Sequence, residues 1–318
     1  MDNLSNIDPK IHINLIDKIT SNQQPILSPI ISKNNKHVIW QIYNFLSPQE
    51  CQQIINNFES QTQFKIFNSQ NRQSKRILAF DNNDKLNTIF KERLLTDNFL
   101  NKLNTIKWKP PYGFNDGIEW YGNGNNFNLC FRLNKYESNS HGFKHHRDLQ
   151  YTELDDIKSN YTIVIFLNNL DDGNLNILIP PEDHKPIGID IQTELSTYKF
   201  ETISIKPREG MAVIFDQRLI HIANKNTQEK YIIRTDLLCN GTQIEKVKDT
   251  ENKKLCQRLF RLAQISELEE NYNLANQLYE ITTTLRMFPK SKYFSKQLQD
   301  KFLNDDIDQM YQKKINNE

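Results

Sequence analysis

The sequence predicts an α+β protein whose core is a sandwich or barrel of two facing β-sheets. Between residues 126 and 238, seven short runs rich in β-branched and aromatic residues alternate with turns, and no long helical pattern interrupts them. Helical patterns precede and follow this region. We therefore expect a β core with flanking N-terminal helices and a C-terminal helical extension. The seven runs are "NFNLCFRLNKY", "GFKHHRD", "YTIVIFLNN", "NLNILIP", "FETISIKP", "MAVIFD" and "KYIIRTDLL".

Changes in composition divide the chain into three predicted regions. Residues 1–36 are polar and interrupted by prolines, with one apolar-periodic patch from Ile11 to Ile19, which predicts an arm or a lightly docked helix. Residues 37–240 hold the β-rich domain. Residues 241–318 have apolar side chains at three- and four-residue spacing, which predicts helices packed as a layer against the sheet. Two of these helices also resemble a single tetratricopeptide hairpin, but one copy is weaker evidence than the pattern of a packed helical layer.

The first part of the central domain carries strong local signals. The run "HVIWQIYNFL" predicts a strand, and a helix follows with Ser47 as N-cap, Pro48 at its first position and Glu50 as the reciprocal cap. A second helix is expected from Asp84 to about Leu95. The segment 108–124 contains two consecutive prolines and several glycines, which predict a loop.

Composition argues against several classes of function. The 318 residues include 40 basic and 39 acidic side chains, for a net charge of +1. Without a basic excess, we expect neither nucleic acid nor membrane as a partner, and a nucleic-acid demethylase is disfavoured. No apolar run is long enough to span a bilayer, and the N-terminus lacks the pattern of a signal segment. The widely spaced cysteines predict no disulfide framework, so we expect an intracellular protein, cytoplasmic or nuclear. They are Cys51, Cys130, Cys239 and Cys256.

The stretch "KHHRDLQY" suggests a metal site. Side chains two apart in a strand share a face, so His146 and Asp148 point the same way while Arg147 points oppositely. Taken alone, such a pair has an alternative interpretation, a surface histidine that lies near a surface aspartate without a metal. His221 follows a buried-type strand in "EGMAVIFDQRLIHIANK". Two histidines and one carboxylate leave three coordination positions open, the arrangement suited to non-haem Fe(II).

The next strand adds a basic pair. Lys230 and Arg234 are four residues apart in "KYIIRTDLL" and are therefore expected on one face. A basic residue on a strand beside the metal could bind the remote carboxylate of a dicarboxylate co-substrate.

Residues 37–240 resemble the Fe(II)/2-oxoglutarate-dependent dioxygenases of the prolyl 4-hydroxylase-like group. The resemblance lies in "RLNKYESNSHGFKHHRD", in "IVIFLN" followed by "DDGNLNILIPPE", in "KPREGMAVIFD" with the later histidine, and in "KYIIRTDLL". Two departures are an Asp172–Gly173 pair where relatives have two glycines, and Phe166 where the group often has tyrosine. The resemblance implies a double-stranded β-helix (jelly-roll) core.

The resemblance also implies roles for individual residues. His146, Asp148 and His221 would hold the iron, and the hydroxyl of Tyr136 would bind the far carboxylate of 2-oxoglutarate. Lys230 aligns with the anchor of the prolyl hydroxylases and Arg234 with that of other dioxygenases. We favour Lys230 and expect Arg234 to line the same pocket.

The function implied is hydroxylation of an unactivated C–H bond, with release of succinate and CO₂. By analogy, the substrate would be a prolyl residue in a protein or peptide. The implied cofactors are Fe(II), 2-oxoglutarate and O₂, with L-ascorbate as reductant. Two alternatives remain: a dioxygenase acting on another side chain or a small molecule, and a catalytically silent barrel with a helical adaptor. The sequence leaves the oligomeric state open.

Overall fold

The computed structural model describes residues 10–20, 24–33, 38–95, 107–108, 118–121, 126–148, 152–154, 157–184 and 191–243, with single positions at 259, 274, 277 and 278. The chain divides into two compact units, residues 1–109 with 120–242, and residues 110–119 with 243–318. The predicted C-terminal helices lie outside the described residues except at those four positions, which are helical. They and the predicted region boundaries therefore stay predictions. No helix within the described ranges is long and apolar enough to cross a bilayer.

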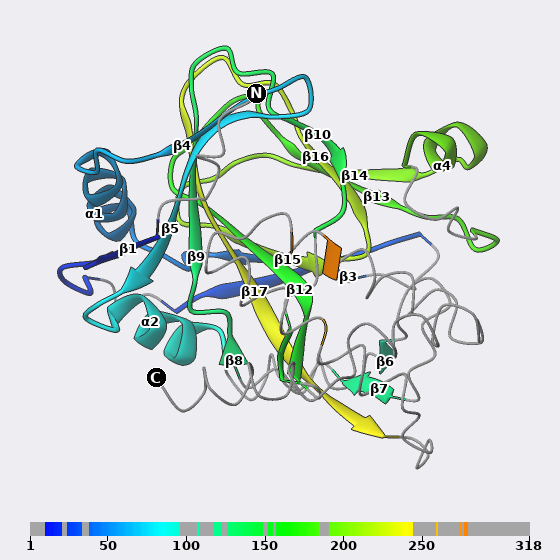
Figure 1. The fold of residues 1–318 in the computed structure, drawn as a ribbon, viewed down its shortest axis with the longest axis horizontal. Coiled ribbons are helices and arrows are strands. Elements are labelled where there is room, and N and C mark those ends of the chain that lie inside the picture. The colour runs from blue at the N-terminus through cyan, green and yellow to red at the C-terminus, as the bar shows by residue number, and fades with distance from the viewer. Residues whose placement is uncertain are drawn as a thin grey trace. The chain divides into compact units, whose positions relative to one another are not determined.

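Two facing β-sheets, one of 13 strands and one of four, form the core (Figure 1). The central strands of the first sheet have the order β9-β17-β12-β15, the second sheet has the order β10-β16-β13-β14, and neighbours in both orders are antiparallel. The chain passes from one sheet to the other at almost every strand, which is the connectivity of a jelly roll, or double-stranded β-helix. The predicted fold is confirmed. The strands are β9 (Phe131–Tyr136), β10 (Phe143–His146), β12 (Ile157–Phe166), β13 (Leu175–Ile179), β14 (Glu201–Ile205), β15 (Ala212–Asp216), β16 (Ile220–Ala223) and β17 (Lys230–Gln243).

The central strand β12 is buried on both faces. Ile163 and Ile165 pack in one apolar cluster with residues of the N-terminal helices. Val164 and Phe166 point the other way, into a second cluster that includes Ile177 of the facing sheet. A strand covered on both sides loses the alternation of polar and apolar residues. This is why "YTIVIFL" reads as one continuous apolar run.

Strands from the first 81 residues extend the first sheet. β5 (Gln73–Asp81) pairs with β9, and β4 (Lys65–Asn68) pairs with β5. At the other edge, β3 (Val38–Tyr43) pairs with β15. This strand lies in the run "HVIWQIYNFL", where the sequence predicts a strand. Three further short strands are β6 (Lys107–Trp108), β8 (Asn126–Phe127) and β11 (Thr152–Leu154).

Two expectations for irregular or helical segments are wrong. The segment expected to be an arm or a docked helix contains β1 (Lys10–Ile13), parallel to β5, and β2 (Ile26–Ile31), antiparallel to β3. Ile11 and Ile13 pack against the core at a spacing of two residues, the period of a strand rather than of a helix. Within the expected loop 108–124, β7 (Ile118–Tyr121) pairs with β6.

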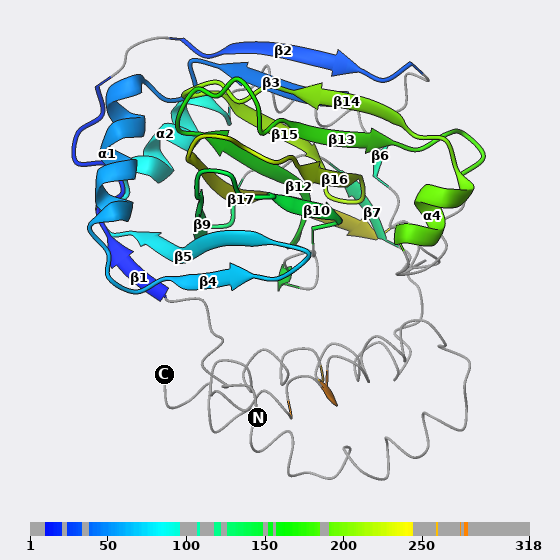
Figure 2. The same ribbon diagram turned by 90° about the horizontal axis from the view of Figure 1, so that it is seen from above.

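Both N-terminal helices form where the sequence predicts them, and the first has the predicted cap. α1 (Pro48–Glu59) begins with a capping box, in which the Ser47 hydroxyl accepts from the Glu50 N–H and the Glu50 carboxylate accepts from the Ser47 N–H. α2 (Lys85–Arg93) follows Asp84, as expected. α4 (Ile191–Thr197) precedes β14. Figure 2 shows α1 and α2 at one end of the sheets and α4 at the other.

The carboxylate of Glu50 also joins the two helices. The side chain is fully buried, and both its oxygens accept from the guanidinium of Arg93, at 2.8 and 3.0 Å. The N–H of Thr20 donates to the same carboxylate at 3.0 Å. Burial opposes ionisation, but the Arg93 guanidinium and the N–H groups of Ser47 and Thr20 hold the pKa of Glu50 below its usual value.

Replacing this carboxylate is expected to destabilise the fold. Glu50→Gln leaves the Arg93 charge buried without its partner, which should lower the free energy of unfolding by about 3 kcal/mol in urea denaturation. The exposed control Glu92→Gln should stay within about 0.5 kcal/mol. Because the folded pKa of Glu50 is depressed, its contribution is full above the usual value of 4.5 and is lost as pH falls through the folded pKa. The gap between wild type and variant should therefore narrow in acid, and a gap that widens would contradict this role.

Candidate metal centre

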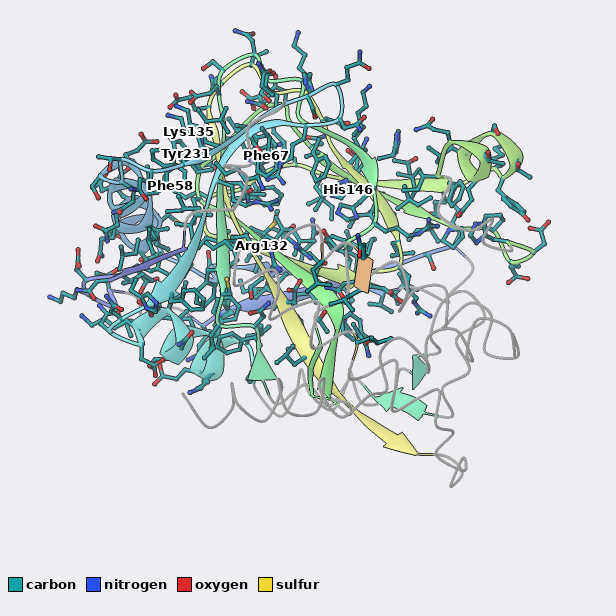
Figure 3. All side chains as sticks on the ribbon, in the orientation of Figure 1. Phe58, Phe67, Arg132, Lys135, His146 and Tyr231 are labelled. Carbon is teal, nitrogen blue, oxygen red and sulfur yellow. The ribbon has the colours of Figure 1, made fainter. Side chains whose placement is uncertain are left out.

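The structure brings together the three predicted metal ligands. His146, which is labelled in Figure 3, lies at the end of β10. It is the register partner of His221 in β16, and Asp148 follows two residues after it. One ligand atom from each of the three residues lies within 4.8 Å of the others. The imidazole of His221 and the carboxylate of Asp148 are both nearly buried, with 6% and 8% of their side chains exposed. A shared, largely dry corner is what a metal site requires.

Both imidazoles present the same nitrogen to this corner. The Nδ1 atom of His146 lies 2.7 Å from the carbonyl of Lys144, and the Nδ1 atom of His221 lies 3.1 Å from the carbonyl of Leu219. A carbonyl only accepts, so each Nδ1 carries the proton and each Nε2 keeps a free lone pair. Burial lowers the pKa of His146 to about 3 and also lowers the pKa of His221. Both rings are therefore neutral at physiological pH.

The Asp148 carboxylate is ionised. Burial alone would raise its pKa, but the Arg234 guanidinium and the hydrogen bond from the Thr162 hydroxyl hold the pKa well below its usual value. An Nη of Arg234 lies 3.2 Å from Oδ1, and the hydroxyl of Thr162 donates to Oδ2 at 2.6 Å. Two neutral imidazole nitrogens and one anionic oxygen match the donor set of a non-haem Fe(II) centre. The residues present thus fit the metal that the sequence predicts.

Arg147 fixes the segment that carries two of the ligands. As the strand period predicts, its side chain points away from the metal corner. Its guanidinium donates to both oxygens of Glu194 in α4, at 3.2 and 2.7 Å, and to the carbonyl of Arg218 at 2.9 Å. Glu194 is fully buried. This bidentate ion pair ties the segment that follows β10, which includes Asp148, to α4.

A cavity opens in front of the three ligands. The empty space in front of the ligands, counted out into open solvent, is about 540 Å³. Apolar side chains of both sheets form much of its wall. The described residues that line it are Arg72, Arg76, Asn134, Tyr136, Phe143, His146, Asp148, Val164, Phe166, Leu175, His221, Ala223, Lys230, Ile232 and Arg234.

Lys230 and Arg234 both line this cavity, on one face of β17, but they make different contacts. The ammonium of Lys230 is buried, donates to the carbonyl of Gly173 at 2.9 Å and lies 4.6 Å from the centre of the Tyr136 ring. Burial lowers the pKa of Lys230 to about 8. Arg234 instead contacts Asp148 and, at 2.9 Å, Asp236. Its Nε atom is buried with no hydrogen-bond partner among the described residues.

Several residues around the site carry no obvious signal in the sequence. Thr162 is an ordinary strand residue until the fold places it under Asp148. Arg72 and Arg76 come from a segment far from the triad, although their spacing of four in a strand could have indicated a shared face. Arg132 pairs with the buried carboxylate of Asp236 at 3.0 Å.

No protein-family model and no curated protein sequence matches this chain. Similar solved structures include a viral collagen prolyl hydroxylase from Paramecium bursaria Chlorella virus-1 in complex with 2-oxoglutarate (16% identity, 64% of this chain and 96% of that chain, TM-score 0.39). They also include a prolyl hydroxylase from Trichoplax adhaerens in complex with a peptide of hypoxia-inducible factor (16% identity, 62% of this chain and 82% of that chain, TM-score 0.40). A third is SnoK, a non-haem α-ketoglutarate-dependent carbocyclase from nogalamycin biosynthesis (13% identity, 71% of this chain and 91% of that chain, TM-score 0.46).

These solved structures are similar to this chain in fold. Identities of this size concern the fold alone. The chemistry of the site therefore depends on the side chains of this chain.

The hydroxyl under Asp148 is expected to support metal binding. Thr162→Val keeps the shape of the side chain but removes the donor to Oδ2, which should weaken Mn(II) or Co(II) binding about tenfold, as the loss of partners of metal ligands does. Isothermal titration calorimetry on the metal-free protein measures this affinity. Thr202→Val on the exposed face of β14 is the matched control. Equal metal affinity in wild type and both variants would contradict the role of Thr162.

Proposed function

We propose that this protein is an Fe(II)/2-oxoglutarate-dependent dioxygenase that hydroxylates an unactivated C–H bond. The observation that carries the proposal is the convergence of two neutral imidazoles and one ionised carboxylate within 4.8 Å, beside a cavity. Bound Fe(II), with 2-oxoglutarate and O₂, supplies the oxidation and releases succinate and CO₂. The protein holds the metal through His146, Asp148 and His221, orients both substrates and excludes water.

Lys230 is the proposed anchor for the remote carboxylate of 2-oxoglutarate. The guanidinium of Arg234 already contacts two carboxylates, whereas the ammonium of Lys230 donates to a neutral carbonyl and keeps its charge for an incoming anion. Burial raises the pKa of Tyr136, so its hydroxyl stays protonated and can donate to the same carboxylate. Arg234 then acts mainly on Asp148, whose charge it balances.

The proposed substrate is a prolyl residue in a protein or peptide, with L-ascorbate as reductant and an intracellular setting. The sequence motifs support this choice, and one similar solved structure is a prolyl hydroxylase with a bound peptide. A small-molecule substrate is the second candidate, since a similar structure is a carbocyclase of nogalamycin biosynthesis. A catalytically silent barrel is disfavoured. The contacts that keep both imidazoles neutral and the Asp148 carboxylate ionised contribute nothing to apolar packing of the core.

Catalysis is tested by product formation. Iron-loaded protein with 2-oxoglutarate, O₂ and ascorbate is expected to release succinate and to add one oxygen atom to a proline-containing peptide from a panel, as mass spectrometry would record. Asp148→Ala removes the anionic ligand and should abolish both products. Full succinate release by that variant would contradict the assignment.

The anchor is tested by the affinity for 2-oxoglutarate. Lys230→Met should weaken binding to the Mn(II)-loaded protein at least about tenfold, the loss of a charge-assisted hydrogen bond. The exposed Lys91→Met should leave the affinity unchanged. A larger loss in Arg234→Met than in Lys230→Met, with metal affinity intact, would reverse the assignment of the two residues.

A further inference from the structure

The ammonium of Lys230 lies in surroundings that oppose its charge. The side chain is 2% exposed, and among the described residues its nitrogen donates one hydrogen bond, to the carbonyl of Gly173 at 2.9 Å. An ammonium has three N–H bonds, so two remain for other acceptors. The nitrogen lies 4.6 Å from the centre of the Tyr136 ring, which offers a π face rather than an anion. Burial of this kind favours the neutral amine and lowers the pKa of Lys230 to about 8.

A carboxylate beside Gly173 in the chain opposes this loss of charge. Asp172 attracts the ammonium and raises the pKa of Lys230, against the larger effect of burial. Asp172 is thus the charged group that acts on this pKa. The phenol of Tyr136 faces the ammonium from β9. The other titratable or charged residues that line the cavity are Arg72, Arg76, His146, Asp148, His221 and Arg234.

One oxygen of Asp172 holds the carboxylate in place and the other is left over. Its Oδ2 atom accepts from the N–H of Thr227, in the turn before β17, at 2.9 Å. Its Oδ1 atom is buried with no hydrogen-bond partner among the described residues. A buried carboxylate oxygen without a donor costs free energy, which attraction to a nearby cation offsets. The hydrogen bond from Thr227 therefore explains half of this carboxylate, and the charge of Lys230 explains the rest.

Gly173 lets the segment approach the ammonium closely. Its φ is +69°, in the left-handed region that favours glycine. A Cβ at this position would lie 3.0 Å from the Cβ of Asn226 and 3.5 Å from the nitrogen of Lys230. Asn226 is fully buried and donates to the carbonyls of Glu137 at 2.9 Å and Gln228 at 2.6 Å, which fixes this wall. The turn that carries Asp172 thus fits against Lys230 because residue 173 has no side chain.

We propose that Asp172 is a positioning residue for the co-substrate, which keeps the Lys230 ammonium charged and in place for the remote carboxylate of 2-oxoglutarate. The inference rests on the proposed function, and it concerns the pH range in which the anchor works. Asp172 acts through Lys230 and is not a catalytic residue. The alternative is that Asp172 only holds the turn before β17 through Thr227, which would leave the charge of Lys230 unaffected.

The charge of Lys230 limits the binding of 2-oxoglutarate as pH rises. With a pKa of about 8, the ammonium is almost fully charged at pH 6 and half charged at pH 8, so the affinity of wild type should fall about twofold between them. Removing the charge of Asp172 should lower the pKa of Lys230 by about one unit, the low end of an ion-pair effect. About a tenth of the ammonium then remains charged at pH 8, and the affinity should fall about tenfold over the same range.

The test compares Asp172→Asn with Asp171→Asn. Calorimetry measures the affinity for 2-oxoglutarate at pH 6 and pH 8 on protein saturated with Mn(II), so no turnover is needed. Asp172→Asn keeps an oxygen for the N–H of Thr227 but removes the charge. Asp171→Asn is the matched control, because this neighbouring carboxylate is fully exposed and pairs with Lys206 at 2.7 Å. The ratio of the two affinities should be about tenfold in Asp172→Asn and about twofold in wild type and control. Equal ratios in all three proteins would overturn the proposal.

A second measurement follows Lys230 without the co-substrate. The carbon-13 chemical shift of its Cε atom, assigned by comparison with Lys230→Met, gives the pKa in an NMR titration. The titration should be centred at about pH 8 in wild type and at a lower pH in Asp172→Asn. An unchanged titration in the variant would overturn the proposal. Failure of the proposed function gives a different result: wild type would bind no 2-oxoglutarate, although the NMR titration still moved in the variant.

Discussion

The buried Asp148 carboxylate keeps its negative charge because the groups around it outweigh the cost of removing it from water. Arg234 approaches one oxygen, and the Thr162 hydroxyl donates to the other. If this carboxylate were protonated, the two neutral imidazoles beside it would lack the anion that a divalent cation needs. The metal chemistry, the place of 2-oxoglutarate and the use of the cavity all depend on this charge.

The double-stranded β-helix explains how ligands far apart in sequence share one corner. His146 and His221 lie on neighbouring strands of the second sheet, in direct register. The buried Asp236 carboxylate accepts from Arg234, Arg132, Asn128 and Gln217, which fixes the arginine that balances Asp148. The ion pair of Arg147 with Glu194 ties the end of β10, beside the metal ligands, to α4. The site is thus supported from both sheets and from a helix.

Features that depend only on residues near one another in the sequence could be predicted from the sequence. The strand period put His146 and Asp148 on one face, and the Ser47–Glu50 spacing predicted the start of α1. The fold followed from the strand-rich runs together with the resemblance to known dioxygenases. The pairing of His146 with His221 could be inferred only through that resemblance, because strand register is a long-range property.

The failures of prediction have the same origin. Ile11 and Ile13 show a strand period only in a short polar context, and β1 forms because β5 offers it an edge. Arg72 and Arg76 line the cavity because β5 pairs with β9, which brings both arginines to Asn134. Thr162 acquires its role in the same way, from the position of β12 under the metal corner.

The most direct test of the central claim is the visible absorption spectrum of the protein with Fe(II) and 2-oxoglutarate under anaerobic conditions. Chelation of 2-oxoglutarate by iron held through one carboxylate and two imidazoles should produce a weak charge-transfer band, which a metal chelator should abolish. A colourless mixture at concentrations that saturate both ligands would contradict the account.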